Sequence, residues 1–274
     1  MPELPEIEVL RRSLEPRLTG RRVERVEVRV PSLREPLEPR QLARRLTGRR
    51  ILGLRRRGKY LWIDVDGGST LAVHLGMSGR LTLAPDATPR EPHEHLALRL
   101  DGGERLRLRD PRRFGAAFVR ATAELDHDPH FAHLGREPLE PPLTGGELAR
   151  LAAGRRAPIK SFLMDARRIV GIGNIYASEA LFRARVRPDR AVDRIGRTTW
   201  ERLADAVVAV LEQAIAEGGT TLNDFRDGAG KAGLFQVSLA VYGRDGEPCP
   251  RCGARIRRFV QAGRSSFYCL RCQR

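Results

Sequence analysis

The sequence has no long apolar segment. No stretch approaches about 18 consecutive uncharged apolar residues, the length typical of a membrane-spanning helix. The N-terminal residues include the acids Glu3, Glu6 and Glu8, where a secretory signal carries basic residues followed by an apolar core. We therefore expect neither a membrane span nor Sec export.

Lysine is scarce. Of the 50 basic residues only Lys59, Lys160 and Lys231 are lysines, and the other 47 are arginines. Genomic base composition alone can produce such a skew. The alternative is that these three positions need a compact primary amine, which the planar and permanently charged guanidinium group of arginine cannot replace.

Acidic residues are also too few to balance the basic ones. The 34 Asp and Glu residues leave a net charge of +16. A polyanionic partner is therefore favoured, because each phosphate neutralised by the protein releases a condensed counterion. Nucleic acid is the leading candidate and an acidic membrane surface is the second. With 274 residues, of which 41% are apolar, the chain is long enough for about two domains with ordinary cores, which argues against intrinsic disorder.

The first half of the chain predicts one short helix followed by an antiparallel β-sandwich. Leu4, Ile7, Leu10 and Leu14 recur at helical spacing. After them the pattern changes to short β-branched or alternating runs that are separated by Gly, Pro and Asp turns. These runs are residues 23–30, 60–65, 71–74, 96–100 and 114–119. We assign residues 1–125 to this domain.

The second half is mainly helical. Residues 126–146 are rich in His, Pro and Gly and are predicted to be a linker. A helical domain is expected over residues 147–235. Its apolar spacing and its stop signals predict helices over residues 146–153, 158–164, 175–184 and 199–217. Residues 220–236 contain too much glycine for a rigid element and are predicted to form a loop. The fold class is thus α+β with two domains.

All four cysteines lie close to the C-terminus. Cys249 and Cys252 form one pair, and Cys269 and Cys272 form another after sixteen intervening residues. This spacing predicts a tetrahedral zinc site, and two disulfides are the alternative. Four thiolates leave no open coordination position, so the zinc is expected to be structural. The surrounding module, residues 244–274, carries eight arginines and two acids, which favours contact with the DNA backbone over a merely solvated surface.

The N-terminus offers a possible nucleophile. If Met1 is removed, Pro2 has a free secondary amine at the positive end of a helix, and this field disfavours the protonated amine. Such an amine can attack an aldehyde or a sugar anomeric carbon to give an iminium. Glu3 lies next to it and Glu6 one helical turn further on, both suited to proton transfer. The alternative is that these acids only complement the helix dipole.

Several glycine-containing segments add to this pattern. Residues 55–60 place Lys59 at the start of a strand. Residues 74–79 and 110–115 each end a strand in a tight turn and present large side chains. Residues 171–177 form a glycine-rich turn that opens a helix, and its free N–H groups suit a phosphate.

Taken together, these segments resemble the formamidopyrimidine-DNA glycosylase family over essentially the whole chain. The resemblance is carried by eight ordered motifs, namely MPELPE, RRGKYL, HLGMSGRL, DPRRFG, GIGNIYASEALF, GGTTLNDF, GLFQVSLAVYGR and GRSSFYCLRCQR. The related endonuclease VIII branch typically has glycine where this chain has Leu4, so MPELPE favours the formamidopyrimidine branch.

The resemblance implies a set of catalytic residues. Pro2 is expected to attack C1′ of a nucleotide that is flipped out of the duplex. Glu3 is expected to donate the proton that opens the deoxyribose ring, with Glu6 as its supporting carboxylate. Lys59 is expected to assist β-elimination and to contact a phosphate, and Arg264 to assist δ-elimination.

The resemblance also implies DNA contacts. Three large side chains are expected to fill the hole that the extruded base leaves, although without the resemblance two of them, Met77 and Phe114, would be interpreted as core residues. The fill-in residues are Met77, Arg112 and Phe114; the phosphate ligands are His74 and Asn174; and the further contacts are His93, Arg155 and Lys160. Lys231 falls within residues 220–236, the loop expected to cap the lesion.

The implied protein is a bifunctional DNA glycosylase and abasic-site lyase of base excision repair that removes 8-oxoguanine and formamidopyrimidines. It combines an N-terminal β-sandwich and catalytic helix with a helix-two-turn-helix domain and a zinc ribbon. It needs one structural zinc ion and no organic cofactor, binds damaged double-stranded DNA, and is a monomeric cytoplasmic bacterial protein associated with the nucleoid. The alternatives are an endonuclease VIII-type enzyme for oxidised pyrimidines and a non-catalytic zinc-ribbon DNA-binding protein.

Overall fold

The structure is a computed structural model that describes residues 2–220 and 238–274. The chain divides into two compact units. The first comprises residues 1–132 and 217–234, and the second comprises residues 133–216 and 235–274. The division at residue 133 falls inside the segment predicted as a linker.

The first unit begins with helix α1 (Leu4–Leu18). Its predicted apolar positions are all fully buried, which confirms the helical spacing in the sequence. Proline is tolerated at the start of the helix because the first N–H groups of a helix have no partner within it. The Glu6 side chain turns back to accept from the Glu3 N–H, as in a capping box.

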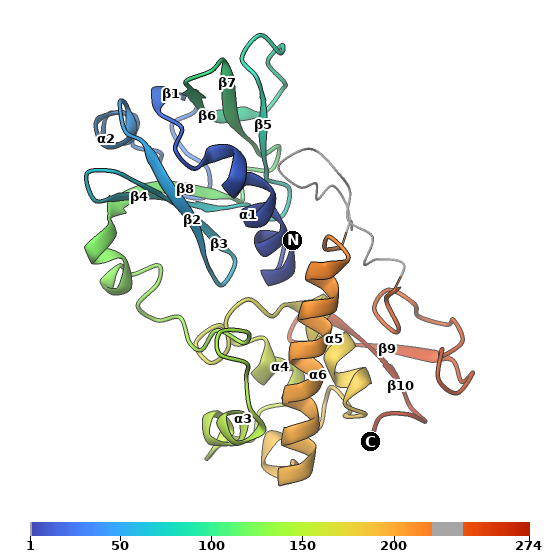
Figure 1. Ribbon diagram of the computed structural model, residues 1–274. Helices are drawn as coiled ribbons and strands as arrows, with labels where there is room; N and C mark the ends of the chain where they lie inside the picture. The colour runs from blue at the N-terminus through green and yellow to red at the C-terminus, as the bar shows by residue number, and fades with distance from the viewer. Residues whose placement is uncertain (1, 221–237) are drawn as a thin grey trace. The chain divides into compact units, whose positions relative to one another are not determined.

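Two antiparallel four-stranded sheets follow (Figure 1). One has the strand order β1-β6-β7-β5 and the other β2-β3-β4-β8. The leucine, isoleucine and valine side chains of both sheets form one continuous core with those of α1, so the predicted β-sandwich is confirmed. The strands are β1 (Val23–Val28), β2 (Ile51–Arg57), β3 (Tyr60–Val65), β4 (Ser69–His74), β5 (Arg80–Pro85), β6 (Glu94–Leu100), β7 (Glu104–Arg109) and β8 (Ala116–Ala121).

Four elements of this unit were not predicted. They are helix α2 (Pro39–Leu46) and strands β2, β5 and β7. Strand β7 shows the reason, since its sequence alternates arginine and leucine. Both leucines are buried in the core. Arg105 and Arg107 are almost as buried, because their long apolar stems pack along the sheet while their guanidinium groups bind carbonyl or carboxylate oxygens. A short 3₁₀ helix, η1 (Thr122–His127), ends the unit's continuous part.

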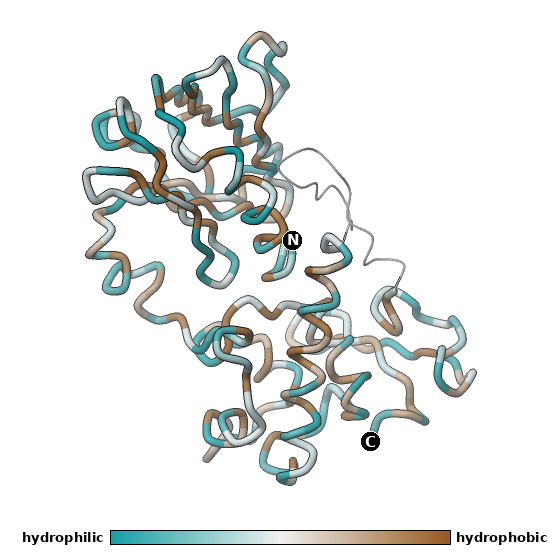
Figure 2. Tube along the Cα trace, in the orientation of Figure 1, coloured by the Kyte–Doolittle hydropathy of each residue, from teal (hydrophilic) through white to brown (hydrophobic). Residues whose placement is uncertain are grey.

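The second unit contains four α-helices, each within two residues of its predicted bounds. They are α3 (Gly145–Ala152), α4 (Ile159–Leu163), α5 (Asn174–Arg183) and α6 (Arg197–Ala216), joined in part by the 3₁₀ helix η2 (Val192–Arg194). Polar and apolar residues are interspersed along α6 at helical spacing, and its predicted apolar face is buried (Figure 2). None of the helices in the described part of the chain is long and apolar enough to cross a membrane.

A hairpin of strands β9 (Ile256–Gln261) and β10 (Arg264–Cys269) lies near the C-terminus. Figure 1 shows it in red beside α5. A small core joins the hairpin to that helix, and it contains Phe182, Val241, Ile256 and Phe267 with two of the cysteines. The predicted zinc-binding module is therefore packed onto the helical unit.

Candidate functional site

The four cysteines of the second unit converge on one point. Their Sγ atoms all lie within 4.8 Å of one another. The Cys249–Cys272 and Cys252–Cys269 Sγ separations are 3.9 and 3.5 Å. In a tetrahedral site with Zn–S bonds of about 2.3 Å the sulfur atoms are about 3.8 Å apart. The geometry of the donor set therefore fits one zinc ion.

The first unit holds the predicted nucleophile at the start of α1. Pro2 is half-buried and directly precedes Glu3, the N-cap residue of α1. Glu3 and Glu6 are both buried. Glu6 Oε2 accepts from the Glu3 N–H at 2.8 Å, and its Oε1 accepts from the Thr220 N–H at 2.8 Å. Glu6 therefore fixes the backbone that carries Pro2 and Glu3.

A second carboxylate of α1, not among the predicted site residues, anchors the neighbouring hairpin. Glu8 is buried and accepts from Arg11, Arg12 and Arg56. Burial alone raises the pKa of Glu8, but the hydrogen bonds and charges of these arginines outweigh it and lower the pKa below its usual value. Arg56 lies on β2, so this contact joins α1 to the β2–β3 hairpin.

Lys59 lies at the tip of that hairpin. The last β2–β3 pair is Arg57 with Tyr60, so Gly58 and Lys59 form the turn between the strands. The sequence placed Lys59 at the start of a strand, and the structure corrects this by one residue. The turn keeps Lys59 partly exposed.

His74 is presented as a neutral hydrogen-bond donor. It ends β4, it is buried against the Tyr60 ring, and its Nδ1 accepts from the Gly76 N–H at 3.0 Å. Burial lowers the pKa of His74 to about 4, and the positive charges of Arg34 and Lys59 add to this effect. Because Nδ1 accepts, the ring proton is on Nε2, where it can be donated to a phosphate oxygen.

Two adjacent turns present the three large side chains predicted to replace an extruded base. Met77 and Phe114 are 46% and 43% exposed, so the alternative interpretation as core residues is wrong. Arg112 is also exposed, and its guanidinium carbon lies 4.7 Å from the centre of the Phe114 ring. Apolar side chains held in solvent in this way are typical of a binding surface.

The two turns touch through their backbones. A Cβ at Gly76 would lie 2.3 Å from the Phe114 carbonyl carbon, and a Cβ at Gly115 would lie 2.7 Å from the His74 oxygen. The glycines are required because no side chain fits between the turns. His93 lies beside them, since its carbonyl accepts from the Asp110 N–H at 3.0 Å, and its own side chain is exposed.

Lys160, for which a DNA contact is predicted, is buried in this structure. It is 2% exposed, and its Nζ donates to the Ser265 carbonyl at 2.8 Å and to Ser266 Oγ at 2.7 Å. Asn174 Nδ2 donates to the same Ser265 carbonyl at 3.1 Å. A buried ammonium that holds two oxygens in this way leaves little of its surface for a phosphate. Both side chains hold the β9–β10 hairpin, where the adjacent Arg264 is exposed.

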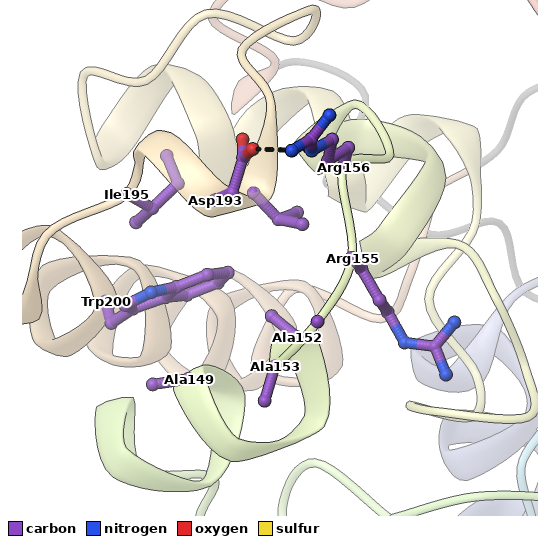
Figure 3. A pocket seen from close by; sticks show the side chains of 10 residues that line it. Ala149, Ala152, Ala153, Arg155, Arg156, Asp193, Ile195 and Trp200 are labelled. Atoms are coloured by element: carbon purple, nitrogen blue, oxygen red, sulfur yellow. Dashed lines mark ion pairs between the residues drawn. The ribbon is translucent and has the colours of Figure 1, made fainter.

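Arg155 lies between α3 and α4 beside a cavity of about 440 Å³. Trp200 and Ile195 form an apolar wall of this cavity, and Arg156 points across its mouth to Asp193, with an Nε–Oδ2 distance of 3.6 Å (Figure 3). The guanidinium group of Arg155 points away from the cavity (Figure 3). The cavity and the predicted DNA contact of Arg155 are therefore separate features.

The predicted capping loop, residues 220–236, lies outside the described residues except for Thr220. Lys231 is among the residues not described. Thr220 is buried and binds Glu6, as given above.

Three family models match the chain. The formamidopyrimidine-DNA glycosylase N-terminal domain matches residues 1–117, and the H2TH domain of the same enzymes matches residues 134–226. The zinc finger found in FPG and IleRS matches residues 246–274.

Whole proteins are similar as well. The formamidopyrimidine-DNA glycosylases of Acidithiobacillus ferrooxidans and Halorhodospira halophila are 48% identical over 274 residues, which is 100% of both chains in each case.

Solved structures agree over nearly the whole chain. The Thermus thermophilus MutM (Fpg) crystal structure is 40% identical, has a TM-score of 0.88 and covers 99% of this chain and 98% of that one. A Lactococcus lactis Fpg variant in complex with a Fapy-dG containing DNA is 32% identical, has a TM-score of 0.92 and covers 100% of both chains. Lactococcus lactis Fpg in complex with an abasic site containing DNA has a TM-score of 0.91 at 32% identity and covers 99% of both chains.

Proposed function

The chain belongs to the formamidopyrimidine-DNA glycosylase family, and on this premise we propose that it excises oxidised purines through the amine of Pro2. It is a DNA glycosylase of base excision repair, and abasic-site lyase activity is typical of its family. The observation that carries the assignment of the nucleophile is the N-terminal turn, where Pro2 directly precedes two buried carboxylates.

The chemistry begins at C1′ of the damaged nucleotide. Once Met1 has been removed, the lone pair of the Pro2 nitrogen forms a bond to C1′. The bond from C1′ to the base breaks, and the base leaves with the electron pair and takes up the proton that the Pro2 nitrogen loses. Glu3 gives a proton to the ring oxygen O4′, so that the sugar opens and the C1′–nitrogen bond becomes an iminium. Glu6 holds the Glu3 backbone in place through its 2.8 Å contact.

The iminium then drives strand cleavage. It acidifies the hydrogens on C2′, and loss of one of them expels the 3′ phosphate in β-elimination. A second elimination expels the 5′ phosphate and leaves a one-nucleotide gap. Lys59, which is partly exposed at its hairpin tip, serves the first elimination, and Arg264, exposed at the start of β10, serves the second.

Both units contribute the DNA contacts of this proposal. In the first unit His74 binds a phosphate and His93 contacts the DNA, while Met77, Arg112 and Phe114 fill the hole that the flipped nucleotide leaves. In the second unit Asn174 binds a phosphate and Arg155 contacts the DNA. Lys160 is reassigned from a DNA ligand to a positioning residue of the β9–β10 hairpin, because its Nζ binds that hairpin.

The zinc ribbon holds one structural zinc ion through Cys249, Cys252, Cys269 and Cys272. We propose that the whole chain has three functional domains, residues 1–125, 147–235 and 244–274. Residues 126–146 are the linker, and residues 220–236 are the capping loop. The curated relatives are bacterial proteins. We further propose a monomer that works in the cytoplasm at the nucleoid.

Borohydride trapping tests the nucleophile. The protein is incubated with an abasic-site duplex and sodium borohydride, which reduces an iminium to a stable covalent complex. Wild-type protein is expected to form this complex, and Pro2→Gly, which supplies only a primary amine, and Glu3→Gln are expected to form at least about tenfold less of it. Absence of a complex with the wild type would favour the non-catalytic DNA-binding protein.

A panel of lesion duplexes tests the substrate. Excision of 8-oxoguanine paired with cytosine and of formamidopyrimidine is expected to exceed excision of thymine glycol. The opposite preference would make the protein an endonuclease VIII-type enzyme, with the same covalent intermediate.

A further inference from the structure

A single buried aspartate lies beneath the three side chains assigned to the vacated base position. Asp110 is fully buried, and each of its carboxylate oxygens binds a different turn. Its Oδ1 accepts from Ser78 Oγ at 2.6 Å, and its Oδ2 accepts from the Gly115 N–H at 2.7 Å. Ser78 belongs to the first turn and Gly115 ends the second, so one carboxylate joins the two.

The backbone of Asp110 joins a third loop to these turns. Its N–H donates to the His93 carbonyl at 3.0 Å, and its carbonyl oxygen lies 2.9 Å from His95 Nε2. His93 has a positive φ of 66°, an uncommon conformation for a side-chain-bearing residue. The contacts of Asp110 thus fix a loop that does not hold this geometry by local preference.

Each exposed side chain is one step away from these contacts. Met77 precedes Ser78, and Phe114 precedes Gly115. The Arg112 N–H donates to Ser78 Oγ at 3.3 Å, so Arg112 is tied to the same serine hydroxyl. The spacing between the three side chains therefore depends on the Asp110 carboxylate.

We propose that Asp110 is the positioning residue that holds Met77, Arg112 and Phe114 as one preformed wedge, and that it acts on base extrusion and not on bond cleavage. The inference rests on the proposed function, in which these three side chains fill the hole in the duplex. Extruding a nucleotide from the duplex already costs free energy, because its base must be unstacked and unpaired. If the three side chains also had to be ordered first, their loss of conformational entropy would add to that cost.

The two acceptor oxygens of the Asp110 carboxylate determine which substitutions can test its role. Alanine removes both acceptors and leaves the Gly115 N–H without its partner. Asparagine has nearly the same shape and can keep both contacts, because its oxygen can accept from Gly115 while the Ser78 hydroxyl reverses and accepts from its NH₂ group. Asp110→Asn is therefore the conservative rescue of Asp110→Ala.

The test compares two substrates that share the chemistry but differ in the need for extrusion. One is a duplex with 8-oxoguanine opposite cytosine, followed by single-turnover excision. The other is a single-stranded oligonucleotide with an abasic site, followed by borohydride trapping. For Asp110→Ala we expect duplex excision to fall at least about tenfold, with trapping on the single strand within about twofold of wild type. Asp110→Asn should recover most of the duplex rate.

Asp128→Ala is the matched control. Asp128 is another buried aspartate of the same unit, but its partners are Arg120 and His130, which lie outside the three loops. The Asp128→Ala substitution is expected to lower the melting temperature without lowering duplex excision more than single-strand trapping. Equal losses of Asp110→Ala on both substrates would overturn the inference, because they would indicate general damage to the fold.

The outcome also separates this inference from the proposed function. Met77→Ala combined with Phe114→Ala should show the same selective loss on the duplex. If it does not, the wedge assignment itself fails. If it does while Asp110→Ala behaves as wild type, only the role of Asp110 fails. Should Asp110→Ala not fold, Ser78→Ala is expected to show the same selectivity with a smaller loss, because it removes the hydroxyl contacts to Asp110 and Arg112 but keeps the contact between Asp110 and the Gly115 N–H.

Discussion

Lys59 presents a primary amine at the tip of a hairpin in a protein that otherwise uses arginine almost throughout. Lysine and arginine attract a phosphate similarly, but only lysine gives up its proton readily. Substitution of Lys59 by arginine keeps the positive charge but not the proton that is readily given up. This substitution can therefore distinguish electrostatic binding from proton transfer.

We predict that Lys59→Arg leaves the affinity for an abasic-site duplex within about twofold, since the charge remains, and slows strand cleavage at least about tenfold, since the guanidinium stays protonated. Affinity is measured by gel shift and cleavage by single-turnover kinetics. Arg55→Lys, an exchange on the preceding strand, serves as the control and should change neither. An equal loss of binding and cleavage would contradict the amine-specific role.

His74 predicts a pH dependence of stability. Its folded-state pKa of about 4 lies below the usual value of 6.5, so the unfolded chain binds the proton more readily. The free energy of unfolding should therefore decrease as the pH falls from about 6.5 to about 4, by up to about 3 kcal/mol from this residue. Urea denaturation at several pH values checks this. His74→Gln should flatten the slope in that window, and an unchanged slope would show that other groups cause it.

At the residue scale the sequence predicted the exposed residues of the site better than the buried ones. The exposed Met77, Arg112 and Phe114 were all named in advance from the motifs. The buried network was missed because the contacts that join separate loops, from Asp110 to Ser78 and from Glu8 to Arg56, link residues that are distant in the chain, and motif spacing carries no trace of such contacts. The burial of Lys160 was missed for the same reason, since its partners are 105 and 106 positions away.

At the scale of elements, prediction succeeded wherever apolar residues followed a clear period. The helices of the second unit and strand β3 are examples, and the β3 bounds were predicted to the residue. It failed for α2, whose only buried apolar residues are Leu42 and Leu46 among four polar or basic neighbours, and for β7, where arginine alternates with leucine. Arginine obscures the apolar pattern of the sequence, because its aliphatic chain packs like an apolar side chain although the guanidinium group makes it a charged residue.

A buried side chain, that of Lys160, helps to hold the β9–β10 hairpin in place. Lys160→Met retains the apolar stem but removes the ammonium. The buried Ser266 hydroxyl then loses this donor, whereas the Ser265 carbonyl still accepts from Asn174. We predict a loss of about 1–3 kcal/mol in the free energy of unfolding, the usual cost of an unsatisfied buried polar group. Faster amide exchange over residues 261–268 should accompany it.

A role in positioning also makes a kinetic prediction. Because the hairpin displays Arg264, Lys160→Met should slow the second elimination more than the first. Product analysis on a sequencing gel would then show β-elimination product accumulating over δ-elimination product. Arg264→Gln is the reference for this pattern, and weaker DNA binding without a change in products would indicate that Lys160 contacts DNA after all.

The whole molecule carries a net charge of +16, and this charge predicts a steep dependence of DNA affinity on salt. If about six phosphates are neutralised, affinity should fall by a factor on the order of 10³ between 50 and 200 mM salt. Fluorescence anisotropy with an abasic-site duplex measures the slope. Exchanging Arg257 and Arg258 of the ribbon together for glutamine should reduce that slope by about two, and a slope unaffected by this change would exclude the ribbon strand from the contact.

The glycines that separate the two wedge turns set a limit on how this surface can change. Gly76 and Gly115 allow the turns to meet backbone to backbone, while Met77 and Phe114 extend freely from them. Substitutions are therefore expected to be tolerated at the tips, Met77 and Phe114, but not at the bases of the turns, Gly76 and Gly115. A library that randomises both kinds of position should yield active enzymes with many different tip residues and almost none with a changed glycine, so a redesign of lesion or opposite-base preference should begin at the tips.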